Sequence, residues 1–222
     1  MSSISKDTLI FLKDLKANND RDWFAANKDR YEEAKANFDL FVDEMIKGIA
    51  TFAPNIAHHT AKSTVFRIYR DVRFSKDKSP YKTHMGAHIT EAKKRSDIHS
   101  RSGYYFHIGP GESMLAGGAY MPQGDWLKNI RQEIDYNGDQ LTAILNDPKF
   151  KATFGELEGE SLVRPPKGYD ENHNHIDLLK KKSFLASHQL ADKEVTSPDF
   201  LAHTLDVYKT LKPLGDFLNA VV

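Results

Sequence analysis

Apolar residues recur every three or four positions near both ends of the chain, which is the spacing of amphipathic helices. The first such stretch runs from Ser5 to about Asn18, and serine is a residue type that caps helix N-termini. Further stretches predict helices over residues 21–49, 125–136, 139–145 and 197–211, with a bend or restart at Pro213. The pattern therefore predicts helices in the N- and C-terminal parts of the chain.

The middle of the chain changes to short segments rich in β-branched and aromatic residues, which are typical of strands. These segments cover residues 65–74, 86–90, 102–108 and 113–121, and we expect three or four antiparallel strands. Gly109-Pro110-Gly111-Glu112 has the composition of a four-residue hairpin loop. Gly117 and Gly118 inside the last segment predict a bulge or the close approach of another backbone or of a ligand.

The order of these elements favours an α+β fold over alternating βαβ units, because the strands gather centrally between helices. We expect a central antiparallel sheet with helices from the N- and C-terminal parts packed against it. The chain has 222 residues and no low-complexity tract. It therefore fits a single domain over residues 1–222, with room for two lobes.

Composition narrows the classes of function. The chain has 31 Lys and Arg residues against 31 Asp and Glu residues, so it has no global attraction to nucleic acid or anionic lipid. It has no cysteine, which excludes disulfides, thiolate nucleophiles and cysteine-ligated metals. No apolar run approaches the roughly 18 residues of a membrane span, and the first residues lack the pattern of a secretion signal. We therefore expect a cytoplasmic protein with no membrane partner.

One segment, residues 66–84, differs from the rest by its charge. It holds six basic residues and two acidic ones in an otherwise neutral protein. If its first half is a strand, Arg70 shares a face with the apolar residues and points toward the core. The apolar residues of that face are Phe66, Ile68, Val72 and Phe74.

A buried guanidinium needs a carboxylate or a bound anion, because an unpaired buried charge is strongly destabilising. One interpretation pairs Arg70 with an acidic residue elsewhere, at Glu32-Glu33 or between residues 156 and 160. The other places it in an anion pocket, since planar arginine forks suit phosphate or carboxylate. Tyr69 or Tyr81 would then be a neutral hydrogen-bond donor.

Four motifs spread over nearly the whole chain form a recognisable set. They are Asn18-Asn19 with Trp23-Phe24, the sequence FRIYRDVRFSKDKSPYK at residues 66–82, Pro166-Lys167-Gly168, and Lys182-Ser183-Phe184. The set resembles an uncharacterised bacterial and fungal family that is catalogued as a domain of unknown function. The resemblance implies one full-length domain, and it implies no activity, substrate or catalytic residue.

Ten histidines raise the question of a metal site. His84 and His88 are four residues apart, but Gly86 and the β-like run that follows favour a strand, which would separate them by roughly 13 Å. His173 and His175 lie in a loop-like segment that we expect to be solvated. The sequence also lacks the glycine-rich and nucleophile-elbow motifs of common enzyme classes. We therefore predict no metal ion and no cofactor.

Three functional hypotheses remain. The first, which we favour, is a small-molecule anion site, binding or enzymatic, for a phosphate- or carboxylate-bearing ligand. The second is a nucleic-acid contact by the same basic stretch, and zero net charge weighs against it. The third is a module that binds an acidic protein. Convergence of the arginines on a concave site would favour the first hypothesis, and an exposed stripe would favour the second.

The candidate residues follow from these hypotheses. The ligand-binding candidates are Arg67, Tyr69, Arg70, Arg73, Lys76, Tyr81, Lys82 and His84. For the nucleic-acid hypothesis, the basic stretch would be extended by Lys93, Lys94, Arg95 and Arg101, with Tyr69, Tyr81, Tyr104 and Tyr105 as stacking groups. No catalytic residue is assigned.

Overall fold

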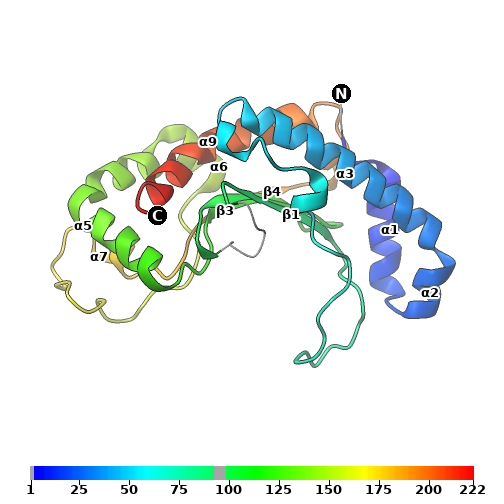
Figure 1. Ribbon diagram of the computed structural model, residues 1–222, viewed down its shortest axis with the longest axis horizontal. Helices are drawn as coiled ribbons and strands as arrows, with labels where there is room; N and C mark the ends of the chain where they lie inside the picture. Colours follow the sequence, from blue (N-terminus) through cyan, green and yellow to red (C-terminus); the bar gives the residue numbers. More distant parts are fainter. Residues whose placement is uncertain (1–2, 93–98) are drawn as a thin grey trace. The chain divides into compact units, whose positions relative to one another are not determined.

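The protein has an α+β fold built around a four-stranded antiparallel sheet (Figure 1). The computed structural model describes residues 3–92 and 99–222. The strands are β1 (Met85–Thr90), β2 (Gly103–Ile108), β3 (Ser113–Ala119) and β4 (Phe184–Leu190), in the order β1-β2-β3-β4. The predicted fold class is confirmed, and so is the hairpin around Gly109-Pro110-Gly111-Glu112, because it joins β2 to β3.

Helices precede β1 and follow β3 in the sequence, but β4 lies apart from the other strands, between α7 and α8. The described helices are α1 (Lys6–Ala17), α2 (Arg21–Ala26), α3 (Lys28–Ala50), α4 (Ala61–Thr64), α5 (Gly124–Asn146), α6 (Pro148–Phe154), α7 (Ile176–Leu179), α8 (Asp192–Val195) and α9 (Phe200–Asn219). Ser5 caps α1 as predicted, since the Thr8 amide donates to its Oγ at 3.2 Å. Among the described residues, no helix has the length and apolar character needed to cross a membrane.

The chain divides into two compact units. Unit 1 comprises residues 1–89, 105–115 and 189–206, and unit 2 comprises residues 90–104, 116–188 and 207–222. Both units contain residues of the sheet strands. The expectation of a single domain over residues 1–222 stays a prediction.

The core of unit 1 is a cluster of aromatic rings between α3 and β2. Phe106 of β2 is fully buried and stacks on Phe38 and Phe41 of α3, with ring centroids 5.4 and 5.2 Å apart. Phe200, at the start of α9, stacks on Phe41 at 5.0 Å. These rings fix one face of β2 against the helices, so the alternate residues of β2 lie on the opposite face.

The predicted long helix over residues 21–49 is two helices, and this prediction was wrong at one residue. Asn27 has non-helical backbone angles (φ −112°, ψ 21°) and separates α2 from α3. Its side-chain amide donates to the Trp23 carbonyl at 2.9 Å. Asparagine side chains compete in this way for backbone groups that would otherwise continue a helix, and the apolar periodicity runs across the break undisturbed.

Unit 2 is built from α5, α6, α7 and the C-terminal part of α9. Trp126 of α5 donates from its indole nitrogen to the Leu218 carbonyl at 3.1 Å, which ties the two long helices together. The two helices predicted over residues 125–136 and 139–145 form one element with non-helical angles at Asn137 (φ −127°). The close backbone approach predicted at Gly117 is confirmed, since a Cβ there would lie 2.3 Å from the Gly103 carbonyl oxygen.

The predicted strand over residues 65–74 does not form, and the fourth strand of the sheet is β4, which the sequence pattern did not predict. Within residues 65–74, only Val65 and Tyr69 make isolated antiparallel bridges, to Ala87 and Tyr81. Ile68 is buried but Phe74 is 95% exposed, so the apolar face that would have turned Arg70 toward the core is not buried along its whole length. The segment instead leaves the sheet as an arm.

Candidate functional site

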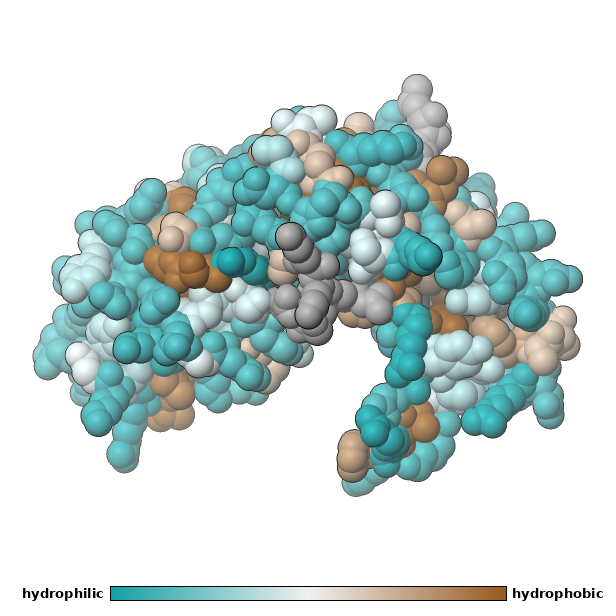
Figure 2. Space-filling view, viewed as in Figure 1, coloured by the Kyte–Doolittle hydropathy of each residue, from teal (hydrophilic) through white to brown (hydrophobic). Residues whose placement is uncertain are grey.

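Residues 66–84, here called the basic arm, form a projecting ribbon in unit 1 (Figure 2). The Phe66 amide donates to the Gly86 carbonyl at 2.9 Å, which joins the arm to the start of β1. Its two halves then pair with each other, because the Lys82 amide donates to the Ile68 carbonyl at 2.8 Å and the Arg70 amide to the Pro80 carbonyl at 2.9 Å. Figure 2 shows the arm as a largely hydrophilic projection.

The base of the arm is anchored to α2 by Tyr81, which is only 5% exposed. Its ring stacks on Phe24 with centroids 4.0 Å apart. The Asn19 side chain makes two hydrogen bonds to the Tyr81 backbone. Its amide donates to the Tyr81 carbonyl at 2.9 Å, and its oxygen accepts from the Tyr81 amide at 3.1 Å. Tyr81 was a candidate ligand-binding residue, and the structure places it in the packing that fixes the arm.

Arg70 holds the two halves of the arm together near its tip. Its guanidinium forms an ion pair with Asp77 and donates to the Ser79 carbonyl at 3.2 Å and to Ser75 Oγ at 3.4 Å. Hydrogen bonds from Ser79, and then from Arg70, hold the pKa of Asp77 well below its usual range. Arg70 is ion-paired as expected, but its partner is within the arm and not at residues 32–33 or 156–160.

Arg73 is also paired inside the arm, although its side chain is 75% exposed. It donates to both oxygens of Asp71, from Nε at 2.9 Å and from Nη2 at 2.6 Å. These hydrogen bonds lower the pKa of Asp71 to about 2. Both acidic residues of the arm are therefore paired with an arginine. The other basic residues give the surface of the arm its net positive charge.

The outward-facing residues of the arm are exposed and do not converge. They are Arg67, Tyr69, Arg73, Phe74, Lys76 and Lys78, together with the arginine-paired Asp71 and Asp77. Phe74 and Tyr69 are 95% and 54% exposed, which is unusual for large aromatic side chains. The Lys78 amine folds back onto the Val72 carbonyl at 3.0 Å and the Lys82 amine onto the Arg67 carbonyl at 2.9 Å. The arrangement is an exposed basic stripe with an aromatic tip.

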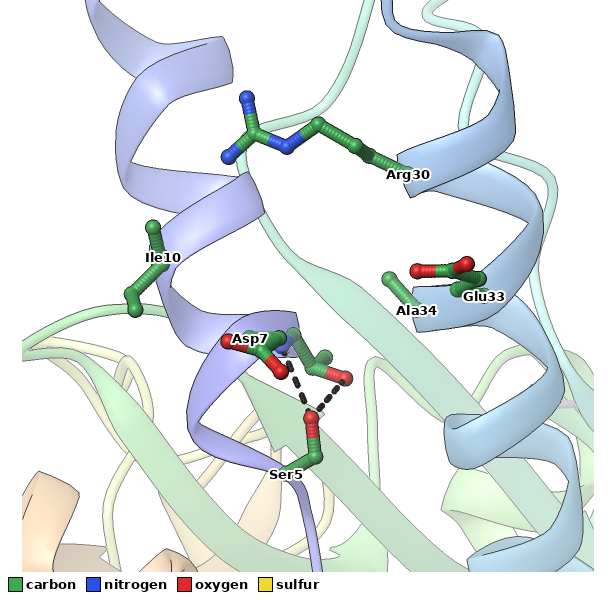
Figure 3. A pocket seen from close by; sticks show the side chains of 7 residues that line it. Ser5, Asp7, Ile10, Arg30, Glu33 and Ala34 are labelled. Carbon is green, nitrogen blue, oxygen red and sulfur yellow. Dashed lines mark hydrogen bonds between the residues drawn. The ribbon is translucent and has the colours of Figure 1, made fainter.

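Two clefts lie in unit 1 near these elements. One, of about 430 Å³, is lined by Asn19, Asp20, Arg21, Val72, Lys78, Ser79 and Pro80. The other, of about 210 Å³, lies between α1 and α3 and is lined by Ser5, Asp7, Thr8, Ile10, Arg30, Glu33 and Ala34 (Figure 3). Both linings mix acidic and basic groups, and Arg30 is already paired with Asp14 at 2.6 Å. Neither lining contains any of the three arginines of the basic arm.

His84 lies at the end of the arm, away from the exposed cations. Its ring stacks on His107 of β2 with centroids 4.2 Å apart. Burial, and to a smaller extent the neighbouring His107 and Lys82, lowers the pKa of His84 to about 4. His84 is therefore a neutral ring in a histidine pair, while His88 lies within β1 as the strand prediction required.

The remaining candidates are placed as follows. Tyr104 is 9% exposed and packs edge-on against Tyr208, so it is not a stacking surface. Lys93, Lys94 and Arg95 lie outside the described residues. The loop histidines expected to be solvated are instead part-buried and paired, His173 with Asp135 at 2.9 Å and His175 with Asp139 at 3.3 Å. Within residues 3–92 and 99–222, no group of three or more His, Asp and Glu side chains could hold a metal ion.

Comparison with known proteins gives a family and no activity. A family model described as conserved hypothetical protein (DUF2461) matches residues 7–217, which is nearly the full chain. The chain belongs to the DUF2461 family. No curated protein and no solved structure matches it. The family thus confirms the resemblance drawn from the motifs, and its description names no ligand or reaction, so the function has to be argued from the geometry.

Sequence reasoning missed two features of the site. Asn19, which clamps Tyr81, belongs to a motif that supported the family resemblance, but nothing in its local pattern indicated a contact 62 residues away. The pairing of Tyr105 with His107 had a usable signal, because residues two apart in a predicted strand share a face. Tyr105 Oη and His107 Nδ1 are 3.0 Å apart.

Replacing His84 with glutamine should flatten the pH dependence of stability between pH 6.5 and about 4. Because the pKa falls from 6.5 in the unfolded chain to about 4 in the native state, the unfolded chain binds the extra proton in this interval. The stability contributed by the neutral ring is therefore complete above pH 6.5 and is lost as the pH falls toward 4.

Thermal denaturation at several pH values measures this effect. The melting temperature of the wild type should fall more steeply than that of His84→Gln over the interval. His58→Gln, at an exposed histidine, serves as the matched control and should behave as the wild type does. Parallel curves for the wild type and His84→Gln would show that this ring is not the titrating group.

Proposed function

We propose that the protein binds single-stranded nucleic acid through the basic arm. Phe74 carries the proposal, because a phenylalanine 95% exposed at the tip of a charged ribbon has no role in the folded core. Exposed aromatic rings flanked by cations offer stacking surfaces to unpaired bases, while the cations meet the phosphates. Arg73 extends this surface, with its guanidinium 5.8 Å from the Phe74 ring centroid.

The geometry supports an extended polyanion better than a small enclosed anion. A small phosphate or carboxylate ligand needs donors that converge on one point. In the arm, Arg70 and Arg73 are held by Asp77 and Asp71, and the other cations are spread along the ribbon. A polynucleotide can meet such charges one at a time along its backbone. Tyr69, 54% exposed, offers a second ring along the same ribbon.

The zero net charge of the chain sets the expected strength of binding. In this proposal the phosphate contacts come from the arm, where four cations, Arg67, Arg73, Lys76 and Lys78, are exposed. The logarithm of the binding constant should therefore fall with the logarithm of salt concentration with a slope of about −2 to −3. This is a modest slope, which distinguishes the arm from a protein with a large basic surface.

Fluorescence anisotropy with a labelled oligothymidine at several salt concentrations tests the proposal. Phe74→Ala should weaken binding by roughly 5- to 150-fold, since stacking on one base contributes about 1–3 kcal/mol, and should leave the salt slope unchanged. Arg67→Ala and Lys76→Ala should each reduce the slope by about 0.7, because each removes one phosphate contact. Tyr136→Ala, at an aromatic residue of α5 that is 72% exposed, is the control and should bind as the wild type does.

Two results would contradict the proposal. One is wild-type binding that Phe74→Ala leaves intact. The other is a melting temperature raised by small phosphate esters or dicarboxylates through Arg73, with no binding of the oligonucleotide. The second result would restore the hypothesis that the arm holds a small anion.

A further inference from the structure

A second site lies on the face of β2 opposite the aromatic core of unit 1. Phe106 points to α3, so its neighbours Tyr105 and His107 point to the other face. His107 is only 7% exposed, and Tyr105 is half-buried. Two polar aromatic side chains are thus placed side by side on a face that the core does not use.

One nitrogen of His107 is bonded and the other is not. Nδ1 lies 3.0 Å from the hydroxyl of Tyr105. Nε2 is buried and has no hydrogen-bond partner in the part of the chain that the structure describes. Leaving such a group unsatisfied costs about 1–3 kcal/mol, so most buried polar atoms have a partner. The unpaired state of His107 Nε2 therefore needs an explanation.

The Tyr105 hydroxyl determines which ring nitrogen carries the proton. Burial raises the pKa of Tyr105, so the phenol stays protonated at neutral pH and can donate. Burial lowers the pKa of His107, so its ring is neutral and has one N–H. When the phenol donates to Nδ1, the ring proton lies on Nε2. His107 Nε2 then carries a buried N–H donor, and the group that pairs with it must offer an acceptor oxygen.

The surroundings of the pair favour an anionic oxygen. The half-buried His84 ring stacks on His107 at 4.2 Å, and Lys82 is close enough to His84 to lower its pKa. Glu112 acts on His84 in the opposite direction, and it also forms an ion pair with Lys16 at 3.9 Å. Lys82 therefore supplies positive charge beside His84, the ring that stacks on His107, while the ion pair with Lys16 offsets part of the negative charge of Glu112.

The Tyr105 hydroxyl packs directly on Gly86 of β1. A Cβ placed on Gly86 would lie 3.4 Å from Tyr105 Oη and 3.5 Å from the Phe66 ring. The absence of a side chain at this position lets the phenol lie over the strand. His84 is half-buried and stacks on His107, so we expect this ring to move when a ligand reaches Nε2.

We propose that Tyr105 and His107 form a binding site for the carboxylate or phosphate group of a small molecule. His107 Nε2–H donates to an oxygen of that group, Tyr105 fixes the tautomer, and Lys82 supplies a nearby positive charge. The site shares the half-buried Lys82 and His84 with the base of the arm but none of the exposed residues that would contact nucleic acid, so the two proposals can be tested separately.

Long-range ¹H–¹⁵N NMR spectra of the histidine rings test the proposal directly. At neutral pH, His107 should show the tautomer protonated at Nε2. Titration with inorganic phosphate and with succinate should shift the His107 ring resonances and saturate, and the anion with the lower saturating concentration identifies the preferred group. Chloride at the same ionic strength should leave these resonances unchanged.

Variants separate this site from the arm. Tyr105→Phe keeps the ring and loses the donor, so the ring proton should redistribute between the nitrogens and anion affinity should fall about fivefold. His107→Gln should abolish the response. Phe74→Ala should bind phosphate or succinate as the wild type does, so failure here is distinguishable from failure of the nucleic-acid proposal.

The proposal is overturned by any of three results. These are a His107 ring protonated at Nδ1 in the wild type, equal shifts with chloride and with the two anions, and an unchanged anion response in Tyr105→Phe. Because Tyr105→Phe retains the aromatic packing, it decides the matter even where His107→Gln fails to fold.

Discussion

Replacing Gly118 with alanine should destabilise the protein by about 3 kcal/mol or more, because two penalties coincide at this residue. Its φ is +115°, a conformation that residues with side chains rarely adopt. A Cβ would lie 2.0 Å from the Phe184 carbonyl oxygen, so the backbones of β3 and β4 would have to separate. A loss of this size is a large part of the roughly 5–15 kcal/mol by which domains are stable.

Gly111 offers a matched control in the β2–β3 turn. Its φ is also positive, at +72°, but a Cβ there would meet nothing within 4 Å. Gly111→Ala therefore carries only the conformational cost of roughly 1–2 kcal/mol. Urea denaturation of both variants measures the difference. A Gly118→Ala midpoint equal to that of Gly111→Ala would show that the strands do not approach as closely as described.

Replacing Phe106 with alanine should cost about 3–5 kcal/mol, which is the range for removing a buried phenylalanine side chain. Phe106 is 0% exposed and contacts the rings of Phe38 and Phe41 as well as Phe200, whose centroid is 6.1 Å away. The cavity would therefore open at the centre of the core of unit 1. At roughly 2–4 °C per kcal/mol for a chain of this size, the melting temperature should fall by about 6–20 °C.

Scanning calorimetry of Phe106→Ala and Tyr136→Ala measures this effect. Tyr136 is 72% exposed, so its truncation should change stability by no more than about 0.5 kcal/mol. A small shift for Phe106→Ala would mean that the ring cluster between α3 and β2 is not the main core of unit 1.

Local sequence patterns predicted the elements whose structure is controlled by the burial of one face, and these elements make up most of the fold. The helical periodicity of α1, α3 and α5 and the Gly-Pro-Gly turn between β2 and β3 are of this kind. The strand β4 was missed because His188 interrupts the apolar face formed by Phe184, Ala186 and Leu190. The break at Asn27 was missed because side-chain competition for a backbone carbonyl leaves the apolar spacing unchanged.

The basic arm shows what composition can and cannot predict. The local excess of positive charge was visible in the sequence, and so was the need of Arg70 for a partner. The identity of that partner, Asp77, depends on how the arm turns back on itself, which side-chain periodicity does not encode. The exposure of Phe74 likewise depends on Asn19 and Phe24, which anchor the arm at Tyr81.

Photocrosslinking from the tip of the arm tests the central claim most directly. A photoreactive benzoylphenylalanine in place of Phe74 should crosslink to a labelled oligothymidine, and the yield should fall as salt is raised. The same amino acid in place of Tyr136, which is also exposed but lies on α5, should give no crosslink above background. Equal yields from the two positions, or no crosslink from position 74 at low salt, would contradict the proposal that the arm binds nucleic acid.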